Sequence, residues 1–438
     1  MLYRNLKVNG GWPLARVPAF RAIRTSSVRQ RTADGERAQR AASGYSLQPT
    51  AYSLAVALAA ALASTSATAA NWEVAPRIEA GYVYNDNFYL ELPGGEVDVS
   101  GAQADAAVTF RTIDPRTTIE ITPRVLATYF PDESDEDSTD YFLSGLVQDE
   151  TPRRRVGIAA DFSQEDVSRS EFPGSEIDGG LGNPDDLDSG RIIERSRRDL
   201  IRVAPYFSYD VSQRYTLDLD ARYIDASFDE TEVGFQEDFT EMGVSAGAAI
   251  RLTPRSSLAL RGVVSQYETT VDADAYGAHL EWATDYSPTS RFYLRLGGQR
   301  TEPDRGDRDT NVIAGIGGRW HSERNRLFLD LTRTVGPISA GTIVERHQLR
   351  FRLDHDISER VTTVLGARFS RNESIEEAST YPTREYAAAD AGIEWRMSRQ
   401  WALAATYTYR WQEYDDEVSD ASSNGILVSV IFEPRRAE

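Results

Sequence analysis

Charged side chains recur at every second position in several stretches of this sequence. Asp218, Asp220 and Arg222 form one such run, and Arg350 and Arg352 form another. Residues two apart point to the same side of a β-strand, so each run would place its charges on one face. The chemistry of such a face is electrostatic, because rings of charge can line a polar channel and select its solutes. The predicted pore-lining residues are Arg124, Arg202, Asp218, Asp220, Arg222, Arg295, Asp330, Arg350, Arg352, Asp390, Glu394 and Arg410.

A second interpretation of the same residues is structural. Opposite charges on neighbouring strands attract one another across a sheet. The same side chains could therefore form an ion-pair network that keeps a polar interior hydrated and stiff. The sequence leaves both interpretations open for each residue.

The residues that enzymes use most often are scarce in this chain. It has four histidines and no cysteine, which excludes disulfides and thiolate metal sites and disfavours a His-rich centre. His279 and Glu281 would share one strand face, but a general base also needs a nucleophile and an orienting group in contact. No GxSxG, Walker-A or GxGxxG motif occurs in the strand-turn-helix context that it requires. We therefore expect no enzyme activity and no cofactor.

Two acidic stretches superficially resemble calcium-binding loops. They read DESDED at 132–137 and DRGDRD at 304–309. Neither follows the D-x-[DN]-x-[DN]-G-x₅-E order of ligands. We expect a solvated acidic surface at these positions and no metal site.

The elements that must position the charges are β-strands. Residues 401–411, WALAATYTYRW, alternate an apolar face with a smaller and more polar one. Trp401, Tyr409 and Trp411 lie at the ends of the apolar stripe, as aromatic rings do at the headgroup level of a membrane. Leu403 and Ala405 lie between them. This strand is therefore predicted to face lipid on one side and a polar lumen on the other.

Short polar turns containing an arginine recur along the chain, for example LTPRSS at 252–257 and ISERVTT at 357–363. Successive turns bracket two long alternating strands and one longer acidic loop, which favours a barrel over a propeller with about four strands per blade. We predict 18 strands, with a count of 16–18 allowed. Their predicted ranges are 72–84, 103–112, 117–130, 140–150, 154–164, 199–211, 214–227, 239–252, 257–270, 274–286, 291–300, 310–321, 326–335, 342–356, 361–371, 384–397, 401–412 and 424–433.

The predicted fold is an all-β transmembrane antiparallel up-and-down barrel, with short periplasmic turns and long acidic extracellular loops. A barrel of this size leaves an aqueous channel unless something fills it. Residues 164–199 form the longest loop, and we expect it to be the one feature able to plug or constrict the lumen. A solvated surface loop is the alternative for this segment.

Residues 1–70 are predicted to be a leader with a signal peptide. The segment is Arg-rich up to residue 50, apolar at about 51–65, and ends in small residues that suit cleavage near 69–71. An organelle transit peptide is the alternative, and the role of residues 1–50 is not indicated. Residues 71–438 would then form a single outer-membrane barrel.

Charge and hydropathy exclude two other classes of protein. Without residues 1–70 the chain carries 39 basic and 66 acidic residues, a net charge of −27, which makes a nucleic-acid partner improbable. The mean hydropathy is −0.46. No run of about 18 apolar residues follows residue 70, so a helical membrane protein is excluded. A β-barrel remains possible because half of each strand is polar.

The start of the predicted barrel, NWEVAPRIEAGYVYNDNFYLE at 71–91, resembles the opening of β-barrel porins of the exopolysaccharide-locus type. The matching residues are a Pro-containing entry, a Gly-Tyr strand and an Asn-Asp-Asn turn: Pro76, Gly81, Tyr82, Asn85, Asp86 and Asn87. The resemblance implies an outer-membrane barrel linked to polysaccharide secretion or surface transport. It carries over no catalytic residues, and the EPRRAE tail departs from the aromatic end that such barrels usually have.

The function expected from these features is a porin or channel in the outer membrane of a Gram-negative bacterium. Small solutes or a secreted polysaccharide would pass by diffusion. The alternative is a plugged or closed barrel that serves as a structural or interaction component of an exopolysaccharide or surface machine. Expected partners are outer-membrane lipid, lipopolysaccharide and the barrel-assembly machinery, with polysaccharide as a candidate and no nucleic acid. The cargo and the oligomeric state are not indicated.

Overall fold

The computed structural model describes residues 72–112, 114–167, 196–229, 236–304, 308–375, 381–417 and 419–434. These residues form 18 β-strands and one short 3₁₀ helix, η1 (Ser134–Glu136). The predicted leader, its cleavage site and most of the 164–199 loop lie outside the described residues. The strands are β1 (Trp72–Asn85), β2 (Val99–Thr112), β3 (Thr117–Tyr129), β4 (Ser138–Thr151), β5 (Arg154–Asp166), β6 (Arg197–Asp210), β7 (Tyr215–Phe228), β8 (Phe239–Thr253), β9 (Ser256–Glu268), β10 (Ala273–Ser287), β11 (Ser290–Pro303), β12 (Asp309–His321), β13 (Asn325–Pro337), β14 (Ile343–Ser358), β15 (Val361–Ser374), β16 (Arg384–Arg396), β17 (Trp401–Tyr414) and β18 (Ala421–Phe432).

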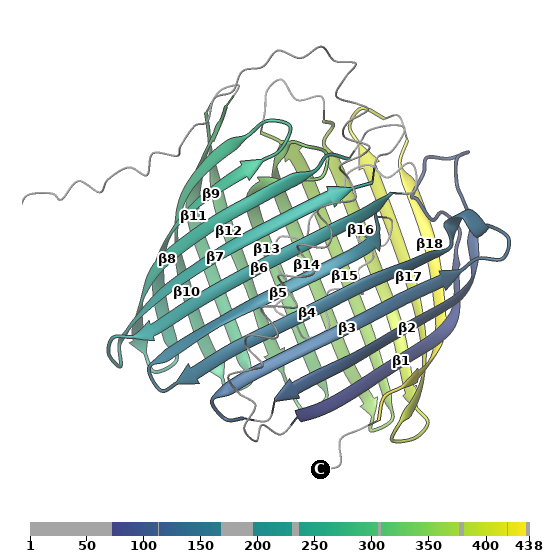
Figure 1. The fold of residues 1–438 in the computed structure, drawn as a ribbon, viewed down its shortest axis with the longest axis horizontal. Helices are drawn as coiled ribbons and strands as arrows, with labels where there is room; N and C mark the ends of the chain where they lie inside the picture. The colour runs from purple at the N-terminus through teal and green to yellow at the C-terminus, as the bar shows by residue number, and fades with distance from the viewer. Residues whose placement is uncertain are drawn as a thin grey trace, which may run out of the picture. The chain divides into compact units, whose positions relative to one another are not determined.

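The strands form one closed antiparallel barrel. Each strand pairs with its neighbours in sequence, and β1 also pairs with β18, from Ile78 opposite Phe432 to Asn85 opposite Gly425. Figure 1 shows the tilted strands running side by side, with β1 and β2 next to β17 and β18. Closure leaves no edge strand with unpaired backbone groups, which is the requirement for a sheet that crosses lipid.

All 18 predicted strands are present, and the predicted fold class is confirmed. The largest shift is at the start of β2, which begins four residues earlier than predicted, at Val99. β18 begins three residues earlier, at Ala421, and β11 and β15 end three residues later, at Pro303 and Ser374. The added residues at those starts are mostly small and polar, VSGA and ASS, so they carry no apolar alternation that could reveal a strand. Pairing with neighbouring strands holds them in the sheet.

The barrel has two unlike ends. At one end, here called the turn end, the strands are joined by connections of two to four residues. The turn before β3 is fixed by Asp114, whose carboxylate accepts hydrogen bonds from the backbone N–H groups of Arg116 (2.8 Å) and Thr117 (3.0 Å). The Thr117 and Arg116 N–H groups hold the pKa of Asp114 below its ordinary value, because they stabilise the charged carboxylate. The other end, here called the loop end, carries the longer connections.

Large apolar side chains cover the outward face. Leu260, Leu296 and Tyr82 are each more than half exposed. Aromatic side chains stand near both ends of this apolar band. Trp282, Tyr286, Phe292, Trp320 and Trp395 lie toward the turn end, and Tyr129 and Phe369 lie toward the loop end. An exposed apolar surface of this extent suits lipid and not water.

The buried apolar residues gather at the loop end, inside the ring. One cluster joins Phe88, Val99 and Phe130, and another joins Tyr267, Val335 and Ile343. Within the described ranges, no helix has the length and apolar character needed to span a membrane. The interior therefore combines a charged wall along the strands with packed side chains at the loop end.

Candidate pore lining

The twelve predicted pore-lining residues all lie at alternating positions opposite to the exposed apolar residues. On β7, for example, Leu217 and Leu219 are exposed outward, so Asp218, Asp220 and Arg222 face inward. Side chains on this face reach across to strands that are not their neighbours, as Arg261 of β9 does toward Asp220 of β7. Such contacts favour the concave side of a barrel, where side chains converge.

Most of these charges pair with other residues of the wall. Arg350 lies 3.2 Å from Asp330, Arg295 lies 2.9 Å from Glu281, and Arg352 lies 2.8 Å from Asp354. The further pairs are Arg124 with Asp105, Arg222 with Glu241, Arg261 with Asp218 and Asp220, and Glu394 with Arg396. The ion-pair network of the second interpretation is therefore present in the inner wall. Contact between these residues and a solute stays a prediction.

The Tyr293–Asp330–Arg350 group joins three strands of this wall, β11, β13 and β14. The Tyr293 hydroxyl of β11 donates to the Asp330 carboxylate of β13, across β12. Gly317 of β12 lies beneath that bond, and a Cβ there would stand 2.7 Å from the Tyr293 ring and 2.8 Å from the Asp330 carboxylate. Glycine is therefore required at this position, because any side chain would separate the hydroxyl from the carboxylate.

Asp330→Asn should weaken the barrel. The carboxylate and the Arg350 side chain are 6% and 12% exposed, so the substitution leaves a buried guanidinium without its counter-charge. We expect the free energy of unfolding to fall by about 1–3 kcal/mol. Urea titration of the barrel in lipid vesicles, followed by heat-dependent gel mobility, measures the change.

Glu373→Gln is the matched control. It removes the same charge from an ion pair with Arg371 whose side chains are 60% and 47% exposed. Exposed pairs contribute about 0–1 kcal/mol, so this variant should unfold at nearly the wild-type urea concentration. An equal loss of unfolding free energy in Asp330→Asn and Glu373→Gln would show that the buried ion pair of Asp330 stabilises the barrel no more than an exposed one.

Three further predicted residues make contacts of other kinds. Asp390 lies against Gly366 of the neighbouring strand. Arg202 pairs in register with Asp161. Arg410 is 2% exposed and donates to the backbone carbonyls of Asn87 (3.1 Å) and Phe88 (2.9 Å), in the loop between β1 and β2. Arg410 therefore holds a loop in place, a role that the alternation along the strand does not indicate.

His279 and His347 lie on opposite faces of the barrel wall. His279 faces inward and is 9% exposed, and neither of its ring nitrogens has a hydrogen-bond partner among the described residues. His347 faces outward and bonds Glu345 at 2.8 Å, while Arg346 between them turns inward to Asn372. Within the described ranges, no three His, Asp or Glu side chains gather in a way that could hold a metal ion.

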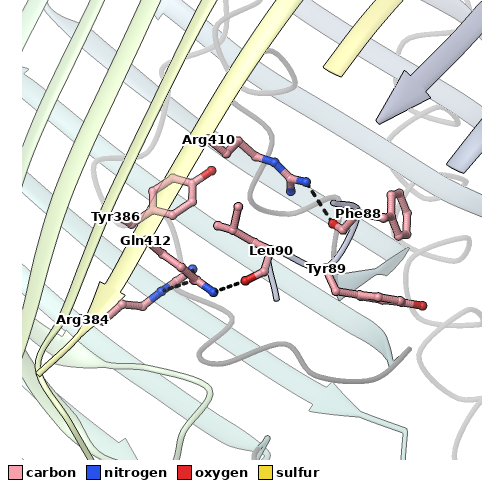
Figure 2. Close-up of a pocket in the computed structure, with 7 residues that line it drawn as sticks. All are labelled: Phe88, Tyr89, Leu90, Arg384, Tyr386, Arg410 and Gln412. Carbon is pink, nitrogen blue, oxygen red and sulfur yellow. Dashed lines mark hydrogen bonds between the residues drawn. The ribbon is translucent and has the colours of Figure 1, made fainter. Parts of the chain in front are cut away.

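The 164–199 loop, most of which lies outside the described residues, is not the one feature able to constrict the lumen. Two other loops turn inward. Residues 338–342, between β13 and β14, bury Ile338 completely, and the Ser339 carbonyl accepts a hydrogen bond (2.6 Å) from the Glu237 N–H of the β7–β8 loop. The second is the β1–β2 loop, in which Phe88, Tyr89 and Leu90 are buried (Figure 2). Length alone did not indicate the β1–β2 loop, although the apolar run FYL at 88–90 within a polar connection was a usable signal.

The residues of the family resemblance lie at the seam where the barrel closes. Gly81 lies opposite Ser429 of β18. The Asp86 carboxylate accepts hydrogen bonds from the backbone N–H (2.6 Å) and side chain (2.8 Å) of Asn424. Asn85 accepts from Ser423 at 2.9 Å. The Asn-Asp-Asn turn therefore joins the first strand to the last at the loop end.

No family model matches this chain, and no curated protein matches it. Among solved structures it is similar to the outer membrane protein opdK from Pseudomonas aeruginosa, at 10% identity over 82% of this chain and 99% of that one, with a TM-score of 0.45. It is also similar to Pseudomonas aeruginosa OccK2 (OpdF) in complex with glucuronate, at 11% identity over 83% and 98%, with a TM-score of 0.43. Acinetobacter baumannii OccAB4 matches at 9% identity over 83% and 98%, with a TM-score of 0.43. The fold described above rests on the strand pairing and not on these likenesses.

Proposed function

We propose that this protein is an outer-membrane channel through which small polar solutes pass by diffusion. The observation that carries the proposal is the closed ring of 18 strands with an apolar outward face and a charged inward face. A closed ring satisfies the backbone inside lipid, and this number of strands encloses more space than side chains alone fill. The proposal involves no catalytic step and no cofactor.

The location and orientation belong to the same proposal. The turn end would face the periplasm and the loop end the cell exterior of a Gram-negative bacterium, as in other barrels with short turns on one side. The outward face would contact outer-membrane lipid and lipopolysaccharide, and the barrel-assembly machinery would insert the chain. Polysaccharide passage, which the sequence resemblance implies, is the finer form of the proposal.

The inner charges would select solutes through their field and not through single bonds. Pairs such as Arg295–Glu281 hold their guanidinium and carboxylate groups at fixed positions along the wall. A solute that enters must replace part of its hydration shell by contacts with these charged groups. Solutes whose polar groups match the charges of the wall would therefore cross most readily. We keep the predicted residues other than Arg410 as candidates for this lining, because Arg410 holds the β1–β2 loop.

A closed barrel with a structural or interaction role is the second candidate. The observation that favours it is the pair of inward-turned loops, which bury Ile338 and Phe88 within the ring at the loop end. These loops would have to leave a gap for the channel proposal to hold.

Solute flux separates the two functions. The purified full chain, inserted into liposomes loaded with an impermeant polymer, should cause swelling in isosmotic arabinose or glucose and slower swelling in larger sugars. Insertion is checked by heat-dependent gel mobility, and empty liposomes are the control. Inserted and folded protein that gives no swelling in any sugar would favour the closed barrel.

A further inference from the structure

The part of the β1–β2 loop that turns inward is residues 87–92, here called the strap. It is tied to the inner wall by side chains of β16 and β17. The Gln412 amide donates to the Leu90 carbonyl at 2.7 Å, and Arg384 donates to Gln412 at 2.9 Å (Figure 2). Arg410 donates to the carbonyls of Asn87 and Phe88. Bonds from a charged, buried donor to backbone oxygens are stronger than neutral ones, so this attachment fixes the main chain of the strap.

Leu90 adds an apolar attachment to the same wall. Its side chain packs with Tyr386, Ala388 and Ala421 and is 4% exposed. Among the described residues it is also the one non-glycine with a positive φ, 62°. Such a conformation is strained for a residue with a Cβ and persists only where the surroundings hold it. The Gln412 bond and the apolar pocket supply that restraint.

The other side of the strap reaches the opposite part of the ring. The Phe88 ring contacts Phe130, at the end of β3, with centroids 5.9 Å apart. The Tyr89 hydroxyl donates to Glu136 of η1. Val167 after β5 belongs to the same apolar cluster, and Phe228 of β7 packs against it. The strap therefore crosses the inside of the ring, from the wall at β16 and β17 to the loop ends of β3, β5 and β7.

We propose that the strap is a fixed bar across the mouth of the channel that sets the largest solute able to enter. Arg410 and Gln412 are its positioning residues. This inference rests on the proposed channel function, since a bar limits size only if a path exists beside it. The 2% and 7% exposure of Arg410 and Gln412 means that they act through the strap and not on the solute.

The test uses single-channel conductance of the full chain in planar bilayers, with neutral polyethylene glycols of graded size added to find the exclusion limit. In Arg410→Ala/Gln412→Ala the strap loses its bonds to the wall, and conductance should rise about two-fold as the open cross-section grows. Larger polymers should also enter. Leu90→Ala removes most of the apolar attachment, keeps the strain of the positive φ and leaves the wall intact, so it should act in the same direction if the first variant does not fold.

A matched control is available on β14. Arg346 and Gln348 are also two residues apart, inward and buried, and Arg346 donates to the Asn372 side chain at 3.1 Å. Arg346→Ala/Gln348→Ala should keep the wild-type exclusion limit. An equal rise in this variant would show a general loosening of the wall and would overturn the role of the strap.

Reversible cross-linking completes the test, because the chain has no cysteine of its own. Leu90→Cys with Ala388→Cys, added to Arg410→Ala/Gln412→Ala, should return conductance to the wild-type value when oxidised and lose that effect on reduction. Wild-type conductance and exclusion limit in a folded Arg410→Ala/Gln412→Ala variant would contradict the strap inference. Absence of conductance from the wild-type chain would instead count against the channel function itself.

Discussion

Ala405→Arg is expected to lower the free energy of unfolding of the barrel by about 2–4 kcal/mol, the cost of a cation near the middle of the lipid face of a barrel. Ala405 lies on β17 within an outward stripe that runs from Trp401 to Tyr409. Its neighbours across the strands are Ile393 and Val428, which offer no counter-charge. Urea titration in lipid vesicles, followed by tryptophan fluorescence, measures the loss.

Ala404→Arg is the control for that substitution. Ala404 is adjacent in sequence but faces inward, opposite Glu394 and Ser429. An arginine there would meet a carboxylate in a polar lumen, so we expect little change in unfolding free energy. A larger loss from Ala404→Arg than from Ala405→Arg would mean that the two faces have been assigned the wrong way round.

Gly81→Val is expected to prevent the ring from closing. The free energy of unfolding should fall by more than about 3 kcal/mol, the upper end of the effects of overpacking. A Cβ at this position would lie 2.5 Å from the Val428 carbonyl oxygen and 2.9 Å from the Ser429 Cα. These are backbone atoms of β18, so the clash can be relieved only by moving the strand that completes the barrel. The measurement is the yield of heat-modifiable, protease-resistant barrel after refolding.

Gly262→Val makes the same chemical change without the clash. A Cβ at Gly262, on the outward face of β9, would meet no atom within 4 Å. Valine favours strands and would add apolar surface toward lipid, so the yield should match or exceed that of the wild type. A wild-type yield of folded barrel from Gly81→Val would show that β1 and β18 can move apart without loss of the barrel, and that glycine is not required at position 81.

The strand plan was accessible from sequence because one physical pattern dominates it. Alternation along stretches such as 401–411 fixes both the strand and its two faces, and recurring turns fix the order of the strands. The inward position of Asp330 and Arg350 follows from that alternation. Their pairing follows less directly, since β13 and β14 are joined at the loop end, whereas neighbours joined by short turns have a nearly fixed register.

The loops were not accessible in the same way. The attachment of Arg410 to residues 87 and 88 joins positions more than 320 apart in sequence, and it depends on how a connection folds back into the ring. Loop length suggested residues 164–199 as the constriction, whereas apolar content at 88–90 marks a loop that is held inside. The bond from Tyr293 across Gly317 to Asp330 was likewise missed, because it joins strands that are not neighbours.

Stepwise conductance in a planar bilayer tests the channel function most directly. The full chain, verified as a folded barrel by heat-dependent gel mobility, should insert in discrete steps and give a steady conductance that scales with salt concentration. Block by a particular sugar would begin to define the cargo. Folded protein that inserts without any conductance would contradict an open lumen and leave the closed, structural barrel as the better account.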